Sequence, residues 1–462
     1  MTAVVTSTPS LELLVQERDG FSIWTGPHGK KNNILGKEND SKVSCTNVEF
    51  SKFSEDGSRL MVVTSNSIFV YDSSTWKELR SFPINSLHSV LSPLGTYLQT
   101  FESSEAYTTE HGNVVLWEIE TGKAVTRQFQ TEMPNGTWHP IQFSSDEVVA
   151  CRLAPNIGID FFDGTDFSKG IVYKLEICGV VRFELSKKPG SYVAAYVSEC
   201  EEEERQASVQ IYACEKLQNQ LLPRRNIVHH YTPKQMKWNN GSTHFLLVTH
   251  PIDERITQLP WELSYLTINM MRGVKVPLDV AGPVIDVQWS YSGNEFAVLY
   301  GFSNDRCATV FDKEGKRLND VKHAFYSTIQ WSPKGNFLCL AGFGSKVSNG
   351  MLFWDYKEES VNKTVKTDTR GCSVYTSGWS ACGRFFMIVI TNKSRQCYTI
   401  YDYTGKFIGT VEKSLGLLQV DWKLEPSKKD DEIATMAKKE QGTAQQQSAE
   451  GNKKKKKKNK KK

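Results

Sequence analysis

A repeated strand-and-turn unit limits what this chain can fold into more than any other feature of the sequence. Nine copies span 369 residues between Phe53 and Trp422, about 46 residues per copy. In the first eight copies a short apolar stretch ends in an aromatic residue or leucine, and a serine or asparagine and a tight turn follow. This period predicts the four-stranded blades of a β-propeller. The copies begin at Phe53, Leu91, Phe143, Leu185, Trp238, Trp289, Trp331, Trp379 and Trp422.

The stretches after each turn support an all-β fold. Several are almost continuously apolar, which predicts strands covered on both faces, as in a blade between two others. A further strand ends in an aromatic residue followed by an acid in six copies, a degenerate form of the WD-repeat ending. The apolar stretches are Leu60–Val63, Phe245–Val248, Phe296–Leu299, Phe337–Leu340 and Phe385–Ile390. The six endings are Tyr71-Asp72, Trp117-Glu118, Phe162-Asp163, Phe311-Asp312, Trp354-Asp355 and Tyr401-Asp402.

The two ends of the chain predict how the ring closes. The ninth copy has only its first strand, from Leu417 to Leu424. Unassigned strands at Leu11–Gln16, Gly20–Trp24 and, more weakly, Asn33–Lys37 would complete that blade and remove an exposed sheet edge. We therefore expect a flexible stub over residues 1–10, one nine-bladed β-propeller over residues 11–426 and a disordered tail over residues 427–462. Two packed propellers are the alternative arrangement.

Charge is concentrated in the predicted tail. Residues 427–462 hold 13 lysines and 5 acidic residues, and the rest of the chain holds 43 basic and 47 acidic residues. The lysine run predicts sequence-independent affinity for RNA phosphates; a nuclear-localisation-like run or a solvated tail without a partner is the alternative. The candidate RNA- or ribosome-binding residues are Lys453, Lys454, Lys455, Lys456, Lys457, Lys458, Lys460, Lys461 and Lys462.

Arg224 and Arg225 are two further candidates for an RNA or ribosome contact. They follow Pro223, and the proline predicts a connection between two blades rather than a strand. An ordinary basic loop is the alternative.

No pattern of catalytic or ligand-binding residues stands out, so we expect no enzyme activity, no cofactor and no metal. Gly342–Lys346 lacks the following helix of a phosphate loop. Four histidines match no familiar zinc spacing: His229, His230, His244 and His250. The acidic run Glu201–Glu204 has no interleaved Asn or Gly that would let the chain wrap around calcium. We therefore expect Glu201–Glu204 to form a solvated loop tip in the fourth blade.

Cysteine usage and hydropathy indicate the compartment. The ten cysteines form no C-x-x-C pair, and Cys151, Cys339 and Cys397 lie in apolar stretches as expected of small core residues. No apolar run is long enough to span a membrane, and Met1–Ser10 does not have the pattern of a signal peptide. A reducing, cytoplasmic location is expected.

The C-terminal half resembles a known family. Pro283–Ser290 is followed by Glu295–Phe302, Ala308–Phe311, Trp331–Gly344 and Gly350–Asp355, and their order and spacing are similar to the propeller of eukaryotic translation initiation factor 2A. The resemblance covers roughly residues 10–426 and is strongest between about 280 and 420.

The resemblance implies a translation initiation factor with no enzyme activity. Its implied partners are the small ribosomal subunit, through rRNA and ribosomal proteins, and also initiator methionyl-tRNA and mRNA, with a monomer expected off the ribosome. A general WD-repeat scaffold, such as a propeller subunit resembling the b subunit of initiation factor three, is the alternative.

Overall fold

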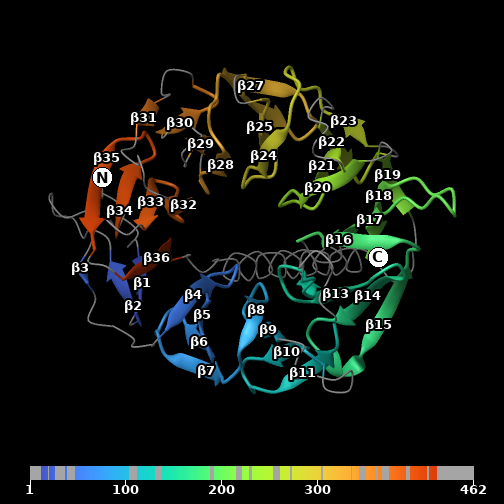
Figure 1. The fold of residues 1–462 in the computed structure, drawn as a ribbon, viewed down its shortest axis with the longest axis horizontal. Coiled ribbons are helices and arrows are strands. Elements are labelled where there is room, and N and C mark those ends of the chain that lie inside the picture. Colours follow the sequence, from blue (N-terminus) through green and yellow to red (C-terminus); the bar gives the residue numbers. More distant parts are fainter. Residues whose placement is uncertain are drawn as a thin grey trace, which may run out of the picture. The chain divides into compact units, whose positions relative to one another are not determined.

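The computed structural model describes residues 12–18, 20–25, 37–38, 47–102, 112–130, 138–187, 192–214, 221–227, 231–252, 261–270, 273–302, 305–334, 336–342, 350–358, 363–366, 374–391, 396–413 and 416–423. The chain divides into a unit Met1–Leu424 and a unit Glu425–Lys462, and the second unit lies outside the described residues. In the first unit, nine four-stranded antiparallel sheets form one ring (Figure 1). This confirms the predicted nine-bladed β-propeller and rules out two packed propellers.

We number the blades 1 to 9 and give the strands of each from the inside of the ring outward. Blade 1 consists of β4 Val48–Phe53, β5 Arg59–Thr64, β6 Ile68–Asp72 and β7 Glu78–Phe82. Blade 2 consists of β8 Ser86–Leu91, β9 Tyr97–Glu102, β10 Val114–Glu118 and β11 Ala124–Gln128. Blade 3 consists of β12 Gln142–Phe143, β13 Val149–Ala154, β14 Gly158–Asp163 and β15 Ile171–Glu176. Blade 4 consists of β16 Val180–Leu185, β17 Tyr192–Val197, β18 Ser208–Ala213 and β19 Leu221–Asn226. Blade 5 consists of β20 Tyr231–Trp238, β21 His244–Pro251, β22 Glu262–Thr267 and β23 Val274–Lys275. Blade 6 consists of β24 Val284–Trp289, β25 Glu295–Tyr300, β26 Cys307–Asp312 and β27 Arg317–Lys322.

Blades 7 and 8 are β28 Thr328–Trp331, β29 Phe337–Gly342, β30 Gly350–Asp355, β31 Lys363–Lys366; and β32 Val374–Trp379, β33 Phe385–Thr391, β34 Gln396–Asp402, β35 Phe407–Glu412. Blade 9 is β36 Leu417–Trp422, β1 Glu12–Glu17, β2 Gly20–Thr25 and β3 Lys37–Glu38. Among the described residues the only helical element is the single 3-10 turn η2 Phe167–Lys169.

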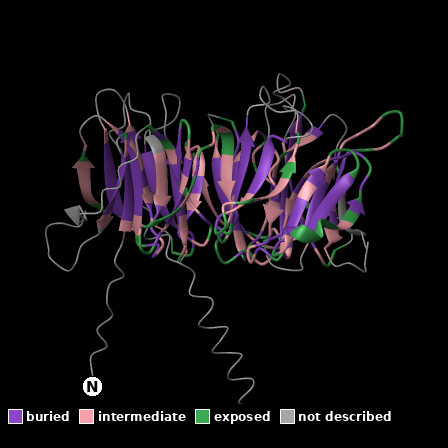
Figure 2. Cartoon of the chain, turned by 90° about the horizontal axis from the view of Figure 1, so that it is seen from below, coloured by how far each residue is buried: buried purple, intermediate pink, exposed green. Residues whose placement is uncertain are grey.

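The apolar core lies between the blades, which explains the continuously apolar strands. One cluster, for example, joins Leu246 and Val248 of blade 5 to Phe296 and Val298 of blade 6, all at most 1% exposed. A side chain on either face of such a strand meets a neighbouring blade, so both faces favour apolar residues. Figure 2 shows buried residues through the thickness of the ring.

The turns behave as their sequences predict. In the Trp289–Gly293 turn the Ser290 N–H donates to the Glu295 carbonyl at 2.8 Å, and Gly293 has a φ of 71°, which favours glycine. The acid of each aromatic–acid ending closes the next turn. The Asp312 carboxylate, for example, accepts the N–H groups of Glu314 at 3.0 Å and Lys316 at 2.8 Å.

The chain ends close the ring as predicted. β36 pairs antiparallel with β1, with Trp422 opposite Leu13 and Val420 opposite Val15. The third N-terminal strand is described only in part. It was expected at Asn33–Lys37 and is found as the two-residue β3, one pair of which joins Thr25 to Lys37; residues 26–36 lie outside the described part.

The three cysteines predicted as core residues are buried. Cys151, Cys339 and Cys397 are fully buried, as expected of core residues, and burial raises the thiol pKa of Cys151 and Cys339 well above its usual value. Across the described segments, no helix has the length and apolar character needed to cross a membrane.

Candidate binding site at the inner wall of the ring

A ladder of tryptophans joins the blades along one half of the inner wall. Each of the five tryptophans that end an inner strand donates its indole N–H to a backbone carbonyl of the preceding blade. The acceptor is always the next-to-last residue of the inner strand of that preceding blade. The pairs are Trp238 to Glu184 at 2.9 Å, Trp289 to Lys237 at 3.1 Å, Trp331 to Gln288 at 3.0 Å, Trp379 to Gln330 at 2.9 Å and Trp422 to Gly378 at 3.0 Å.

The residue before the end of each inner strand points the opposite way, toward the next blade, because side chains alternate along a strand. We call this the inner-wall position. Gln142, for example, donates to the Phe183 carbonyl at 3.0 Å and accepts the Leu185 N–H at 2.7 Å. The nine inner-wall residues are Lys52, Val90, Gln142, Glu184, Lys237, Gln288, Gln330, Gly378 and Asp421.

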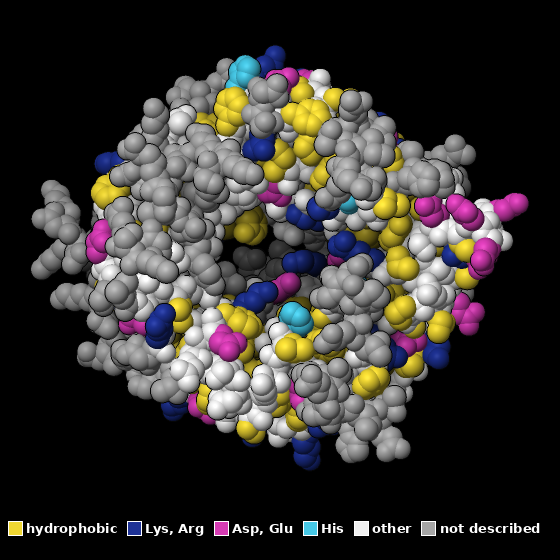
Figure 3. All heavy atoms as spheres, viewed as in Figure 1, with side chains coloured by type: hydrophobic (Ala, Val, Ile, Leu, Met, Phe, Trp, Pro, Cys, Tyr) yellow, Lys and Arg dark blue, Asp and Glu magenta, His cyan; other side chains and the backbone are white. Residues whose placement is uncertain are grey.

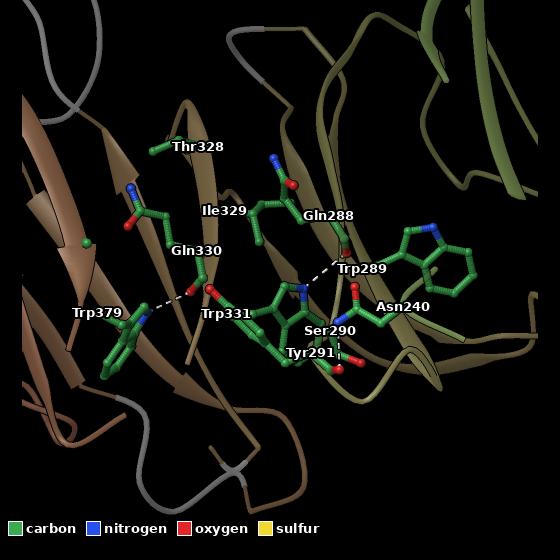
Figure 4. Close-up of a pocket in the computed structure, with 11 residues that line it drawn as sticks. Asn240, Gln288, Trp289, Ser290, Tyr291, Thr328, Ile329, Gln330, Trp331 and Trp379 are labelled. Carbon is green, nitrogen blue, oxygen red and sulfur yellow. Dashed lines mark hydrogen bonds between the residues drawn. The ribbon is translucent and has the colours of Figure 1, made fainter. Parts of the chain in front are cut away.

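A groove of about 520 Å³ crosses the inner wall at blades 5 to 8 (Figure 4). Its amide and hydroxyl side chains alternate with aromatic rings, and none of its described lining residues is charged. Asn240 holds one end by donating to the Tyr291 carbonyl at 2.8 Å. The lining residues are Asn240, Gln288, Trp289, Ser290, Tyr291, Thr328, Ile329, Gln330, Trp331, Gly378 and Trp379.

Beside the groove, a band of charged side chains runs along blades 4 and 5. Arg182 pairs with Glu184 at 3.0 Å, and the Lys237 ammonium donates to the Val287 carbonyl at 2.8 Å. Burial raises the pKa of Glu184 and lowers the pKa of Lys237. Figure 3 shows Lys and Arg side chains along one side of the central opening, and the exposed Lys234 of β20 belongs to the same inner strand as Lys237.

The placement of Arg224 and Arg225 corrects the sequence interpretation. They lie in β19, the outermost strand of blade 4, and not in a connection between blades. Pro223 fits there because an outer edge strand does not need every N–H for pairing, and the register shifts beside it. Arg225 lies 3.6 Å from the Glu262 carboxylate of blade 5, so its guanidinium contributes to a contact between blades.

The other predicted residues divide between described and undescribed parts. All nine candidate lysines of the tail, and also His229 and His230, lie outside the described residues. His244 and His250 lie buried in β21, and Glu201–Glu204 forms an exposed turn between β17 and β18, as expected of a loop tip. Within the described segments no three His, Cys, Asp or Glu side chains come together as a metal site.

The groove was not predicted from the sequence. Its residues belong to the repeat endings and look like core residues when each blade is considered alone. One signal was available. Gly378 is the only glycine among the nine inner-wall residues. An alignment of the repeats on the aromatic residue or leucine that ends each inner strand would have revealed this exceptional glycine.

Comparison with known proteins relates these blades to a known family. The model of the family described as eukaryotic translation initiation factor eIF2A matches residues 228–420, a stretch that contains every described residue lining the groove. Eukaryotic translation initiation factor 2A of Schizosaccharomyces pombe is 29% identical over 299 residues, covering 63% of this chain and 50% of that protein. The chain is related to the initiation factor 2A family. This confirms the resemblance stated from the sequence.

Two further likenesses bear on fold and alternatives. A crystal structure described as that of the eukaryotic initiation factor matches with a TM-score of 0.74 at 23% identity, covering 90% of this chain and all of that one, which supports the fold alone. The b subunit of eukaryotic translation initiation factor 3 from Xenopus laevis is 24% identical over 402 residues, 82% of this chain and 54% of that protein. The chain thus spans about half the length of these two relatives.

Proposed function

We propose that this chain acts in translation initiation as a non-catalytic factor that docks its propeller on the small ribosomal subunit in the cytoplasm. The observation that carries the proposal is the 2A family match over residues 228–420, which covers blades 5 to 8. A closed ring of nine blades supports a binding role, because it offers a rigid surface with many loops at its rims.

Electrostatics supports an RNA-rich partner. The lysines of residues 453–462 would add attraction to rRNA phosphates. Each lysine–phosphate contact makes the logarithm of the affinity fall by about 0.7–0.9 more for every ten-fold rise in salt concentration. The exposed Lys234 on the inner strand β20 gives the ring a basic group of its own, and Arg182 on β16 adds a second that is paired with Glu184.

Sedimentation tests the proposal directly. The full chain is mixed with purified small ribosomal subunits and separated on a sucrose gradient at low salt. We expect it in the small-subunit fractions, with progressive loss as salt rises. Its absence from those fractions at low salt would refute the proposal.

Two variants separate the tail from the ring. Replacing the nine lysines of residues 453–462 by glutamine keeps the chain length, and deleting residues 427–462 removes the segment. Both should keep the melting temperature within about 2 °C, because a polar, lysine-rich segment buries no core. Both should reduce the salt dependence of subunit binding. A large fall in melting temperature would show that the tail packs on the ring.

We extend the proposal to assistance with initiator methionyl-tRNA. Retention of labelled initiator tRNA on small subunits, with and without the chain, measures this step separately. Equal retention would remove the tRNA role and leave subunit docking intact.

A scaffold role within a multi-subunit factor is the second candidate. The similarity to the b subunit of initiation factor 3 favours it. Affinity purification of the tagged chain that yields a stable complex without ribosomal proteins would support this role over direct docking.

A further inference from the structure

Gly378 is a glycine without a conformational reason. It lies within strand β32, its φ is outside the left-handed region, and a Cβ built on it meets no atom within 4 Å. The other eight blades carry a side chain at the same inner-wall position, among them Val90, Gln142 and Gln330. Glycine weakens a strand interior, and in strands it often marks a place where a ligand approaches the backbone closely.

The groove beside Gly378 has the chemistry of a planar, uncharged ligand. Amide side chains stand along it at Asn240, Gln288 and Gln330, and Ile329 is the only aliphatic residue among the described lining residues. Tyr291 follows the inner strand of blade 6, two blades before that of Gly378, and is 56% exposed. Figure 4 shows Tyr291 close to Ser290 and Asn240. Exposed aromatic rings stack on unpaired bases, and amides hydrogen-bond to base edges.

We propose that this groove binds unpaired bases of single-stranded RNA. Tyr291 offers a stacking surface next to the inner strand of blade 6, Gly378 leaves the backbone open to a base in blade 8, and Gln330 stands in blade 7 between them. The basic side chains of Lys234 and Arg182 on the neighbouring inner strands would face the RNA backbone. The inference deepens the proposed function and rests on it, since the RNA would be ribosomal or messenger RNA.

The lining favours a base over other occupants. A phosphate or an acidic peptide would need cationic groups inside the groove, and the described lining has none. Apolar peptide side chains are usually held by mostly aliphatic and aromatic pockets, whereas five of these eleven lining residues carry amide or hydroxyl groups on non-aromatic side chains.

The test uses the full chain and a fluorescent, unstructured single-stranded RNA, with anisotropy as the measurement. Salt is set high enough to suppress binding by the lysine tail. Gly378→Gln inserts the residue that blades 3, 6 and 7 carry at this position, so it should fold normally. Gly378→Gln and Tyr291→Ala should each weaken binding about ten-fold. The control Tyr403→Ala removes a tyrosine that is 38% exposed in a turn of blade 8 and should change nothing.

Two further probes identify the ligand. An RNA of the same length with abasic nucleotides should bind at least about ten-fold more weakly if bases enter the groove. Three outcomes would each overturn the proposal. The abasic strand could bind as tightly as the normal RNA, or both groove variants could keep the wild-type affinity for RNA. A proline-rich peptide could also bind more tightly than the RNA and lose that binding in Gly378→Gln.

Sedimentation separates this inference from the proposed function. Gly378→Gln that loses RNA affinity but still sediments with small subunits supports both. Wild-type chain that binds RNA through the groove but never sediments with subunits would refute the docking role alone.

Discussion

The two halves of the ring solve the same packing problem with different side chains. From the interface of blades 4 and 5 to that of blades 8 and 9, indole N–H groups link each inner strand to its neighbour. In the other half the matching positions are Phe53, Leu91, Phe143 and Leu185, none of which has a donor. There glutamine amides make the link at three of the four junctions, between blades 9 and 1, 2 and 3, and 3 and 4.

The glutamine links bridge backbone groups in both directions. Gln99 donates to the Ile141 carbonyl at 2.8 Å and accepts the Ile141 N–H at 2.7 Å, which joins blade 2 to blade 3. Gln419 donates to the Ser51 carbonyl at 3.0 Å, which joins blade 9 to blade 1. The comparison teaches that either an indole or a glutamine amide can link neighbouring blades near the channel, at eight of the nine junctions among the described residues.

Truncation of a ladder tryptophan should give the largest effect. Trp331→Ala removes a ring that is 5% exposed, together with its hydrogen bond, and should lower the free energy of unfolding by about 3–5 kcal/mol. Leu91→Ala, at the same position of blade 2, removes a half-buried side chain and should cost about 1–2 kcal/mol. Urea unfolding followed by circular dichroism measures both. Equal costs would mean that the two halves do not differ as described.

Loss of a glutamine link should come next. Gln99→Ala leaves the N–H and the carbonyl of buried Ile141 without their partners and should cost about 2–3 kcal/mol. Gln142→Ala is the matched control, because half-buried Gln142 can be replaced by water at a cost of about 1 kcal/mol. Thermal unfolding of the two variants side by side checks the order. A smaller effect for Gln99 would show that the amide links do not stabilise this half.

The smallest effect on stability is expected at Asp421, in blade 9, where the tryptophan half of the ring meets the glutamine half. Burial raises the pKa of Asp421 in β36 to about 6 from 3.8, and the Gln419 amide that donates to it acts in the opposite direction. The folded protein therefore binds this proton more tightly than the unfolded chain, so wild-type stability falls as pH rises from about 4 to about 6. Asp421→Asn lacks this loss and should be more stable than wild type by about 1–2 kcal/mol at pH 8.

At pH 3 the gain from Asp421→Asn should be nearly gone, because Asp421 of the wild type is then mostly protonated in both the folded and the unfolded chain. Unfolding at a series of pH values measures the difference. A gain that does not change with pH would assign the effect to packing rather than to proton binding.

Much of the fold could be predicted because the repeat is local. Turn residues such as Gly293 and Asp312 fix the chain within a few residues, and the apolar runs of β21 and β25 reveal strands covered on both faces. The prediction failed where pairing rather than local sequence decides. Pro223 suggested a connection and lies in an edge strand.

The sequence by itself determined the blade count, the all-β class, the closure by both chain ends and the family resemblance, because each follows from residues close together in the chain or from a period along it. Only the tertiary structure decided the indole and glutamine links, the inner-wall groove and the open space at Gly378. Those features join residues about 40 to 50 positions apart in neighbouring blades, or at opposite ends of the chain, and the curvature of the ring brings them together.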